Sequence, residues 1–304
     1  MTSRTARLAL LLLPALLRAG VVTDVRAAIA QGDFARGEKL VEQYRARDGV
    51  TPELAEAVSW LGRGALAAKQ IDRAAKYAGD ARKLALEQLK QRALDAEAHL
   101  PLALGASIEV QAHVLAARGE GGEAVNFLRG ELKAYSGTSI VTRIQKNIHL
   151  LSLEGKPAPP LDIATSLGPR AVPLDKLTGH PVLLFFWAHW CPDCKRQGVD
   201  IARLVASYAS KGLVVVGPTR HYGYVDGGRD ASPPEETAYI DVVRKAFYSG
   251  IAGMAAPVSE ANFQNYGSST SPTLVLIDRK GIVRMYHPGA MPLAELEAKV
   301  REVL

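Results

Sequence analysis

The chain has 304 residues, of which 48% are hydrophobic and 22% charged, so it is long enough for two domains and too apolar for a disordered protein. The formal net charge of +6 is moderate, and no dense run of Lys and Arg is interleaved with stacking aromatic residues. This composition favours a solvated basic surface over a nucleic-acid-binding face.

The first 20 residues have the pattern of a targeting segment. Arg4 and Arg7 precede the apolar run LALLLLPALL, residues 8–17, which has the length of a signal-peptide core. The run is shorter than the about 20 apolar residues that span a bilayer. We therefore expect a signal peptide or N-terminal anchor and a periplasmic or otherwise exported protein, with membrane contact only if this segment is retained. An ordinary N-terminal helix is the alternative.

Residues 21–154 show helical periodicity and almost no strand pattern. We expect about six or seven helices joined by short turns, stacked as helical hairpins. Leu61-Gly62 followed by Ala74 resembles the small-residue skeleton of a tetratricopeptide repeat, although Ala and Val replace most of its aromatic residues. A non-repetitive helical bundle stays open. The domain has no catalytic constellation, so we expect it to bind a protein partner in a groove or to mediate self-association.

The proline-rich segment GKPAPP, residues 155–160, predicts the domain boundary. Beyond it, strand patterns alternate with helical patterns. Residues 155–304 therefore predict an α/β domain with a mixed central sheet and flanking helices. The expected strands are residues 182–187, 213–216, 273–277 and 282–286, and the expected helices are residues 192–210, 235–248 and 293–304.

The only two cysteines, Cys191 and Cys194, lie three positions apart where the apolar strand meets a helix. The N–H groups and the dipole of a helix N-terminus stabilise an anion at Cys191, and Pro192 favours the first helical turn. This spacing predicts a reversible dithiol–disulfide centre. No further cysteine is left for a structural disulfide, so partners can set the oxidation state of the pair.

Two other chemistries fit these residues less well. A zinc site could use His189 with both cysteines, but a fourth ligand and spaced Cys/His pairs are missing from the sequence. A peroxidase of the peroxiredoxin type would have a threonine three residues before its reactive cysteine, where this chain has Ala188. We expect neither a metal nor a bound cofactor, and we interpret His189 as a polar loop residue.

The motif FFWAHWCPDC, residues 185–194, is followed far downstream by Ser271-Pro272-Thr273 at the start of a strand. Together these motifs resemble the thioredoxin fold, and most of all the exported thioredoxin-like thiol–disulfide oxidoreductases of the TlpA/ResA type. The opening GKPAPPLD, residues 155–162, is also typical of that family. The resemblance covers residues 155–304 and implies a thioredoxin-like C-terminal domain.

The resemblance implies roles for individual residues. Cys191 would be the nucleophilic and more exposed thiol, Cys194 the resolving thiol, and Trp190 a flank that shields them. Pro272 would be a cis-proline that faces the disulfide. The backbone of Ser271 would pair with a bound substrate strand. The implied partners are protein disulfides and a thiol electron donor.

Asp193 bears on the direction of the reaction. A carboxylate beside the thiols opposes ionisation of Cys191 and so disfavours the reduced form, which points to a reductase of protein disulfides. Lys195 and Arg196 partly offset this effect. An oxidant or isomerase stays open, and so does a partner-binding scaffold whose thioredoxin-like domain turns over poorly.

Two positions depart from the family pattern. Phe185 stands where many thioredoxins carry a buried acid, and Gln197 stands where exported members often have Glu. No obvious side-chain proton acceptor for Cys194 remains in the sequence, and His189 and Asp193 are its nearest substitutes along the chain.

Residues 219–234 form a polar insertion rich in Gly and Pro after the second expected strand. Loops at strand ends flank the site in α/β folds. The insertion is therefore either a tolerated surface loop or a partner-recognition element, with Tyr222 and Tyr224 as its contacts.

Overall fold

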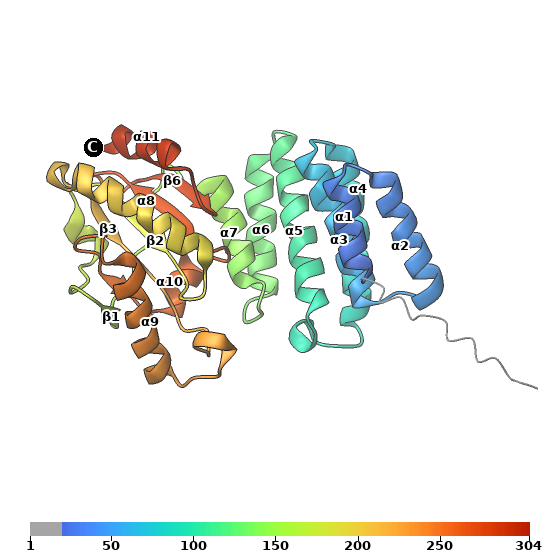
Figure 1. Ribbon diagram of the computed structural model, residues 1–304. Coiled ribbons are helices and arrows are strands. Elements are labelled where there is room, and N and C mark those ends of the chain that lie inside the picture. Colours follow the sequence, from blue (N-terminus) through green and yellow to red (C-terminus); the bar gives the residue numbers. More distant parts are fainter. Residues whose placement is uncertain (1–19) are drawn as a thin grey trace, which may run out of the picture.

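The computed structural model describes residues 20–304, in which a helical lobe is followed by an α/β lobe (Figure 1). The targeting segment expected over residues 1–20 lies, apart from Gly20, outside the described residues. The helical lobe runs from blue to green in Figure 1, and its last helix, α7 (Val141–Ser152), lies between α6 (Gly121–Ala134) and the α/β lobe.

Within the described residues, the helical lobe has seven α-helices, and each packs against the next one along the chain. Contacts also join α1 to α3, α3 to α5 and α5 to α7, so alternate helices form a continuous row. Stacked helical hairpins have this arrangement, and the likeness to tetratricopeptide repeats stays a prediction. The other helices are α1 (Val21–Ala30), α2 (Phe34–Asp48), α3 (Pro52–Ala67), α4 (Ile71–Leu89) and α5 (His99–Ala117).

Helix α3 illustrates why these segments are helical. The hydroxyl of Thr51 accepts a hydrogen bond from the backbone N–H of Leu54 at 3.1 Å, and Pro52 starts the first turn. The apolar face of α3 is buried against α1, α4 and α5. Gly62 permits a close approach of α4, because a Cβ there would lie 3.4 Å from the backbone nitrogen of Ala78. Capping and small residues thus fix both the start of α3 and its spacing from α4.

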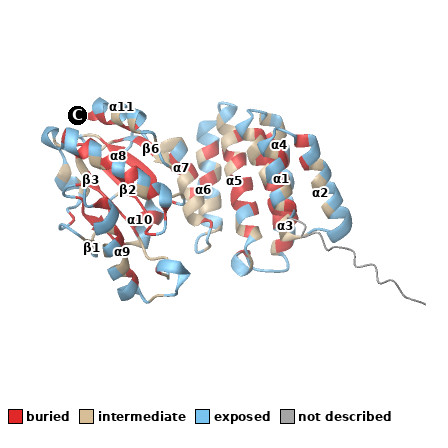
Figure 2. Cartoon of the chain, viewed as in Figure 1, coloured by how far each residue is buried: buried red, intermediate tan, exposed pale blue. Residues whose placement is uncertain are grey.

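Helix α5 is, among the described residues, the one helix long and apolar enough to cross a membrane. It packs against α3, α4, α6 and α7, and 56% of its apolar window is buried inside the lobe. Figure 2 shows the same buried surfaces facing inward between the helices. The apolar composition of α5 is therefore explained by its central position in the helical lobe.

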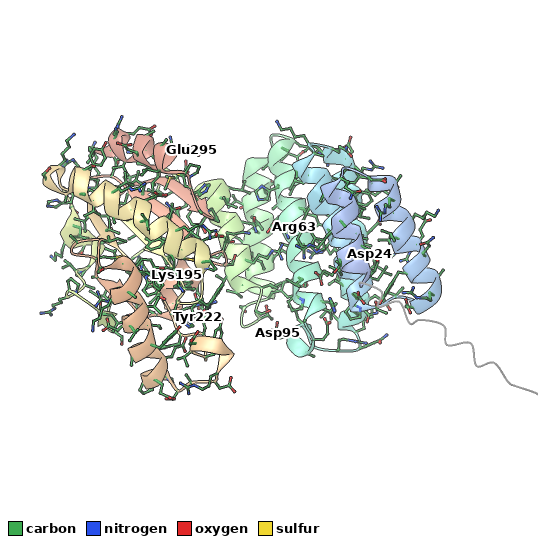
Figure 3. All side chains as sticks on the ribbon, viewed as in Figure 1. Asp24, Arg63, Asp95, Lys195, Tyr222 and Glu295 are labelled. Atoms are coloured by element: carbon green, nitrogen blue, oxygen red, sulfur yellow. A yellow bond between two sulfur atoms is a disulfide. The ribbon has the colours of Figure 1, made fainter. Side chains whose placement is uncertain are left out.

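A half-buried ion cluster joins α3, α5 and α7. The carboxylate of Glu109 lies 3.1 Å from Nε of Arg143, 3.2 Å from Nζ of Lys146 and 3.5 Å from Nε of Arg63. Figure 3 labels Arg63 within the helical lobe. Burial opposes ionisation of Glu109, but the three cations outweigh it and hold its pKa at about 2, below the ordinary 4.5.

The pKa of Glu109 makes the stability of the helical lobe depend on pH. Because the folded pKa is depressed, the contribution is complete above pH 4.5 and is lost as the pH falls toward 2. We expect Glu109→Gln to lower the free energy of unfolding by about 3 kcal/mol at pH 7. This difference between the wild-type protein and the variant should become smaller as the pH falls. Urea unfolding at pH 7, 4 and 3 checks this, with exposed Glu120→Gln as the control. A difference in the free energy of unfolding that stays constant with pH would contradict this prediction.

The α/β lobe is built on a four-stranded sheet with the order β3-β2-β5-β6. Strands β2 and β3 are parallel, whereas β5 is antiparallel to both β2 and β6. The strands are β2 (Val182–Phe186), β3 (Val214–Val216), β5 (Thr273–Ile277) and β6 (Val283–Pro288). The mixed sheet with flanking helices confirms the expected α/β domain after an all-α region.

Both faces of this sheet are covered, which explains the unbroken apolar run of β2. One face packs against α8 (Pro192–Tyr208), α9 (Pro233–Tyr248) and α11 (Leu293–Val303) in a single apolar cluster that includes both cysteines. The other face packs against α10 (Glu260–Asn265) and the chain that leads out of α7. The cysteine pair is therefore part of the core of the lobe.

Some boundaries differ from the expected ones. The strand expected to reach Trp187 ends at Phe186, because the N–H of Trp187 bonds to Pro218 O outside the ladder. The helix expected to reach residue 210 ends at Tyr208 and continues as a 3₁₀ turn, Ala209–Lys211. Helix α10 and a small sheet of β1 (Ser166–Leu167) with β4 (Ala256–Pro257) were not expected, since segments this short carry little periodicity.

The two lobes meet where α7 packs against α10 and β6. Nε2 of His149 lies 2.7 Å from the carbonyl oxygen of Asn265, and the carboxylate of Glu154 accepts a hydrogen bond from Tyr286 N at 3.1 Å. Leu153, just after α7, belongs to the apolar cluster of the α/β lobe. Gly267 lies directly against the backbone of α7. The helical lobe is thus anchored by its last helix.

Candidate active site

The CxxC motif lies at the N-terminus of α8, as expected. Cys191 is the N-cap residue with an extended backbone, and its Sγ accepts a hydrogen bond from the N–H of Cys194 at 3.1 Å. Pro192, which has no N–H to donate, occupies the first helical position. A disulfide joins the two cysteines, whose Cα atoms are 5.3 Å apart. The helix end therefore presents its N–H groups to the sulfur of Cys191.

The Ser271–Pro272 peptide bond is cis, and it lies opposite the disulfide. The carbonyl oxygen of Ser271 is 3.6 Å from Sγ of Cys191. The expected cis-proline at Pro272 is thus present, and the residue before it, Ser271, lies next to a cysteine 80 residues earlier. Pairing of Ser271 with a substrate strand stays a prediction.

The insertion over residues 219–234 packs against the site. The ring of Tyr222 meets the indole of Trp190 edge to face, with centroids 5.6 Å apart, and Tyr222 packs on the apolar cluster that holds the disulfide. Trp190 is 45% exposed, whereas Cys191 is 2% exposed and Cys194 is fully buried. Cys191 is the more exposed cysteine by this small margin only. Trp190 and Tyr222 together border the site on the side of the insertion.

Comparison with known proteins gives relatives of the α/β lobe. The model of the AhpC/TSA family matches residues 155–220. The chain is 29% identical to the thioredoxin-like protein YneN of Bacillus subtilis (strain 168) over 150 residues, 48% of this chain and 78% of that protein. It is 27% identical to the thiol:disulfide interchange protein DsbE of Xylella fastidiosa (strain Temecula1) over 154 residues, 50% of this chain and 70% of that protein.

One similar solved structure is a thiol:disulfide interchange protein of the thioredoxin family from Chlorobium tepidum TLS. It is 20% identical and has a TM-score of 0.38, covering 49% of this chain and 96% of its own. The sequence relatives are thiol–disulfide exchange proteins by name, and this chain has a disulfide-linked cysteine pair at the matching motif. The α/β lobe thus resembles the thioredoxin-like thiol–disulfide oxidoreductases in sequence and in its cysteine pair.

In this thioredoxin-like domain, Asp193 has less influence on Cys191 than the sequence indicated. Its carboxylate pairs with Arg196 one turn along α8, and both side chains are more than half exposed. Water and the paired guanidinium screen its charge from the sulfur. Lys195 instead places its ammonium 4.5 Å from the ring centroid of Phe247. The charge of Asp193 therefore does not account for a preference for disulfide reduction over oxidation, and another group has to supply that preference.

His189 is a polar loop residue, as expected, and it is also buried. It lies in the loop between β2 and α8, but its side chain is only 1% exposed. Its Nε2 is 3.1 Å from Oε1 of Glu236 on α9. The rings of Tyr222, Tyr224 and Tyr239 surround it edge to face at 5.3 to 5.4 Å. Burial lowers the pKa of His189, and Glu236 opposes this shift only in part.

Glu236 is the functional candidate that the sequence did not reveal. Its carboxylate accepts hydrogen bonds from the backbone N–H of Tyr222 at 2.5 Å and of Gly223 at 2.8 Å, besides its contact with His189. In the sequence it is the neighbour of Glu235, which forms the capping box of α9 with Ser232. An acid in a first helical turn is ordinarily a solvated capping residue, so no local pattern marks it as buried.

The two positions where the family often has acids hold neutral side chains in the core. Phe185 is fully buried and meets Tyr248 edge to face, with centroids 5.5 Å apart. Oε1 of Gln197 accepts a hydrogen bond from Met291 N at 2.8 Å, so Gln197 ties α8 to the segment before α11. Neither can accept the proton of Cys194 as a carboxylate would.

A metal centre gains no support around His189. Across residues 20–304, no three His, Cys, Asp or Glu residues are grouped so that they could hold a metal ion. The Nε2 of His189 faces Glu236, and both cysteine sulfurs are joined in the disulfide. The ligands of the zinc alternative are thus engaged elsewhere.

Proposed function

We propose that this protein reduces protein disulfides outside the cytoplasm, with Cys191 as the nucleophile and Cys194 as the resolving thiol. The observation that carries the proposal is the Cys191–Cys194 disulfide at the N-terminus of α8, with Ser271 and cis Pro272 against Cys191. The dithiol itself supplies two electrons, so the reaction needs no bound cofactor. The apolar N-terminal run supports the exported location.

The exchange proceeds in two balanced steps. The Cys191 thiolate attacks one sulfur of the substrate disulfide, forming a mixed disulfide and releasing the other substrate sulfur as a thiolate. Cys194 then loses its proton and attacks Sγ of Cys191, which releases the second substrate thiol and closes the Cys191–Cys194 disulfide. A thiol donor returns two electrons to the protein. The N–H of Cys194 stabilises the first thiolate, because it already donates to Cys191.

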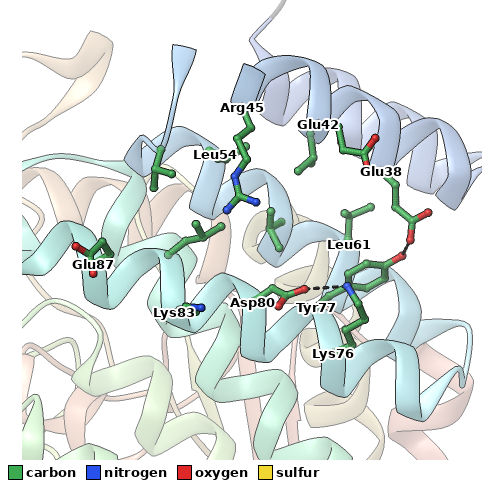
Figure 4. Close-up of a pocket in the computed structure, with 14 residues that line it drawn as sticks. Glu38, Glu42, Arg45, Leu54, Leu61, Lys76, Tyr77, Asp80, Lys83 and Glu87 are labelled. Atoms are coloured by element: carbon green, nitrogen blue, oxygen red, sulfur yellow. Dashed lines mark hydrogen bonds and ion pairs between the residues drawn. The ribbon is translucent and has the colours of Figure 1, made fainter. Parts of the chain in front are cut away.

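Partner choice is the function we propose for the helical lobe. A groove of about 690 Å³ lies between α2 and α4, with α3 as its floor (Figure 4). Its floor is apolar, with Leu54, Val58 and Leu61, and its rims carry acids and bases such as Glu38 and Lys83. Such a surface suits an amphipathic segment of a partner protein.

Insulin reduction tests the proposed function. The reduced wild-type protein should cleave the disulfides of insulin and turn over when dithiothreitol regenerates it. Failure of the wild-type protein to accelerate insulin precipitation would favour the alternative, a partner-binding scaffold with a poorly active site. A reduction potential above about −180 mV would instead favour an oxidant or isomerase.

Replacing Cys194 with Ala should trap substrates on Cys191. The first step remains possible, but the resolving thiol is absent, so mixed disulfides accumulate to near one per protein rather than turning over. Non-reducing gels of the variant exposed to an oxidised protein substrate measure this. The double variant Cys191→Ser with Cys194→Ala is the control, and adducts that persist in it would contradict the assignment.

A further inference from the structure

The buried carboxylate of Glu236 has no part in the exchange steps, yet three segments of the site converge on it. His189 comes from the loop that ends in Trp190 and Cys191, and Tyr222 and Gly223 come from the insertion. Glu236 itself is on α9, and its side chain is 1% exposed. One carboxylate therefore holds the loop before the CxxC motif, the insertion and α9 together.

The hydrogen bonds require Glu236 to be an acceptor on both oxygens. Oε1 faces His189 and the N–H of Tyr222, and Oε2 faces the N–H of Gly223. Backbone N–H groups can only donate, so each oxygen of Glu236 has a donor facing it. An ionised carboxylate accepts at both oxygens and so fits this arrangement, in which Nε2 of His189 also faces Oε1.

The charge of this carboxylate is poorly screened, in contrast to that of Asp193. Both members of the His189–Glu236 pair are 1% exposed, whereas Asp193 and its partner Arg196 are 53% and 73% exposed. The partner of this carboxylate, His189, is two residues before Cys191 in the chain. Lys195 is a cation that faces His189, Arg220 lies over the ring of Tyr222 at 4.9 Å, and Asp226 is an acid facing the neighbouring Tyr239.

We propose that Glu236 is a positioning residue of the redox site, whose buried negative charge destabilises the Cys191 thiolate and so favours the disulfide form. It acts by the field of its charge, without touching the sulfurs. This inference rests on the proposed function, because a site that prefers its own disulfide gives electrons to substrates. It assigns to Glu236 the bias toward reduction that exposed Asp193 is too screened to supply.

Glu236→Gln is the test, because it removes the charge and keeps the size. The pKa of Cys191 in the reduced protein should fall by about one unit, a tenfold change in its dissociation constant, as expected for one unit charge at an effective dielectric of about 20. Thiolate absorbance at 240 nm and the pH profile of iodoacetamide alkylation both measure it. An unchanged pKa overturns the proposal.

Three variants separate charge from packing. Glu235→Gln is the matched control, since it alters the adjacent exposed carboxyl while Gln still serves in the capping box, and it should leave the pKa of Cys191 unchanged. Glu236→Asp and His189→Gln keep the charge while disturbing the contacts, so they should also leave that pKa near the wild-type value. A fall in either that equals the fall in Glu236→Gln would mean loop collapse, and overturns the proposal.

The pKa of Cys191 in the wild-type protein provides a further test, which does not depend on whether a variant folds. Despite the helix N-terminus, the pKa of Cys191 should lie near that of free cysteine, about 8.5, because the carboxylate cancels the dipole. A value below about 6 overturns the proposal. Insulin reduction by the wild-type protein is measured alongside. Its absence would refute the proposed function, whereas the pKa comparison would still decide the role of Glu236.

Discussion

The Cys191→Ser variant is expected to reduce insulin no faster than dithiothreitol alone. A serine hydroxyl does not ionise at neutral pH and forms no disulfide, so both steps of the exchange are lost. The loss should be at least as large as for any other single change in the site, because the attack of Cys194 in the second step depends on the mixed disulfide that Cys191 forms in the first. The rate of insulin precipitation measures it directly.

The fold should tolerate this substitution. Serine is a good N-cap, so its oxygen can accept the N–H of Cys194 as the sulfur of Cys191 does. Losing the short disulfide loop lowers the free energy of unfolding by about 2 kcal/mol relative to the oxidised protein. Cys194→Ser is the matched control, since it lacks the same disulfide and keeps the nucleophile. Insulin reduction that survives in Cys191→Ser would refute the assigned role of Cys191.

Gly267→Ala is expected to loosen the contact between the two lobes and to lower the free energy of unfolding by about 3 kcal/mol. Gly267 has a φ of +59°, and a Cβ there would lie 2.2 Å from the backbone nitrogen of Lys146 and 2.6 Å from the carbonyl carbon of Gln145. Backbone atoms within α7 cannot move aside as a flexible side chain can. The clash therefore pushes α7 away from the α/β lobe.

Gly253→Ala separates the backbone cost from the clash. Gly253 also has a positive φ, +76°, but nothing lies within 4 Å of an added Cβ. It should cost only the about 1–2 kcal/mol of a left-handed alanine. Urea unfolding and limited proteolysis of the segment between the lobes compare the two variants. Equal effects would show that the close packing at Gly267 contributes nothing.

The two active-site cysteines illustrate what local sequence predicts well. An apolar strand, a CxxC pair and Pro192 at the helix start are contiguous, so the N-cap position of Cys191 follows from propensity and spacing. Pro272 lies far away in the chain, and its cis bond was expected only from the resemblance to a family. The chain itself gives no reason for that contact, because the sheet register brings Pro272 and Cys191 together.

His189 and Glu236 illustrate what local sequence misses. A histidine before a motif and a glutamate in a first helical turn are ordinarily solvated, and 47 residues separate them. Their burial depends on how α9 and the insertion pack over the motif. The same holds for Glu109, whose three cations come from α3 and α7.

The sequence by itself determined the order of elements, the break near residue 155 and the chemistry of the cysteine pair, since each depends on neighbouring residues. Only the tertiary structure decided the environment of that pair, with screened Asp193, buried Glu236 and Tyr222 against Trp190. It alone also decided the contact between the lobes, where α7 lies against Gly267. Burial and charge screening are properties of packed surfaces from distant segments, and no local pattern encodes which segments will meet.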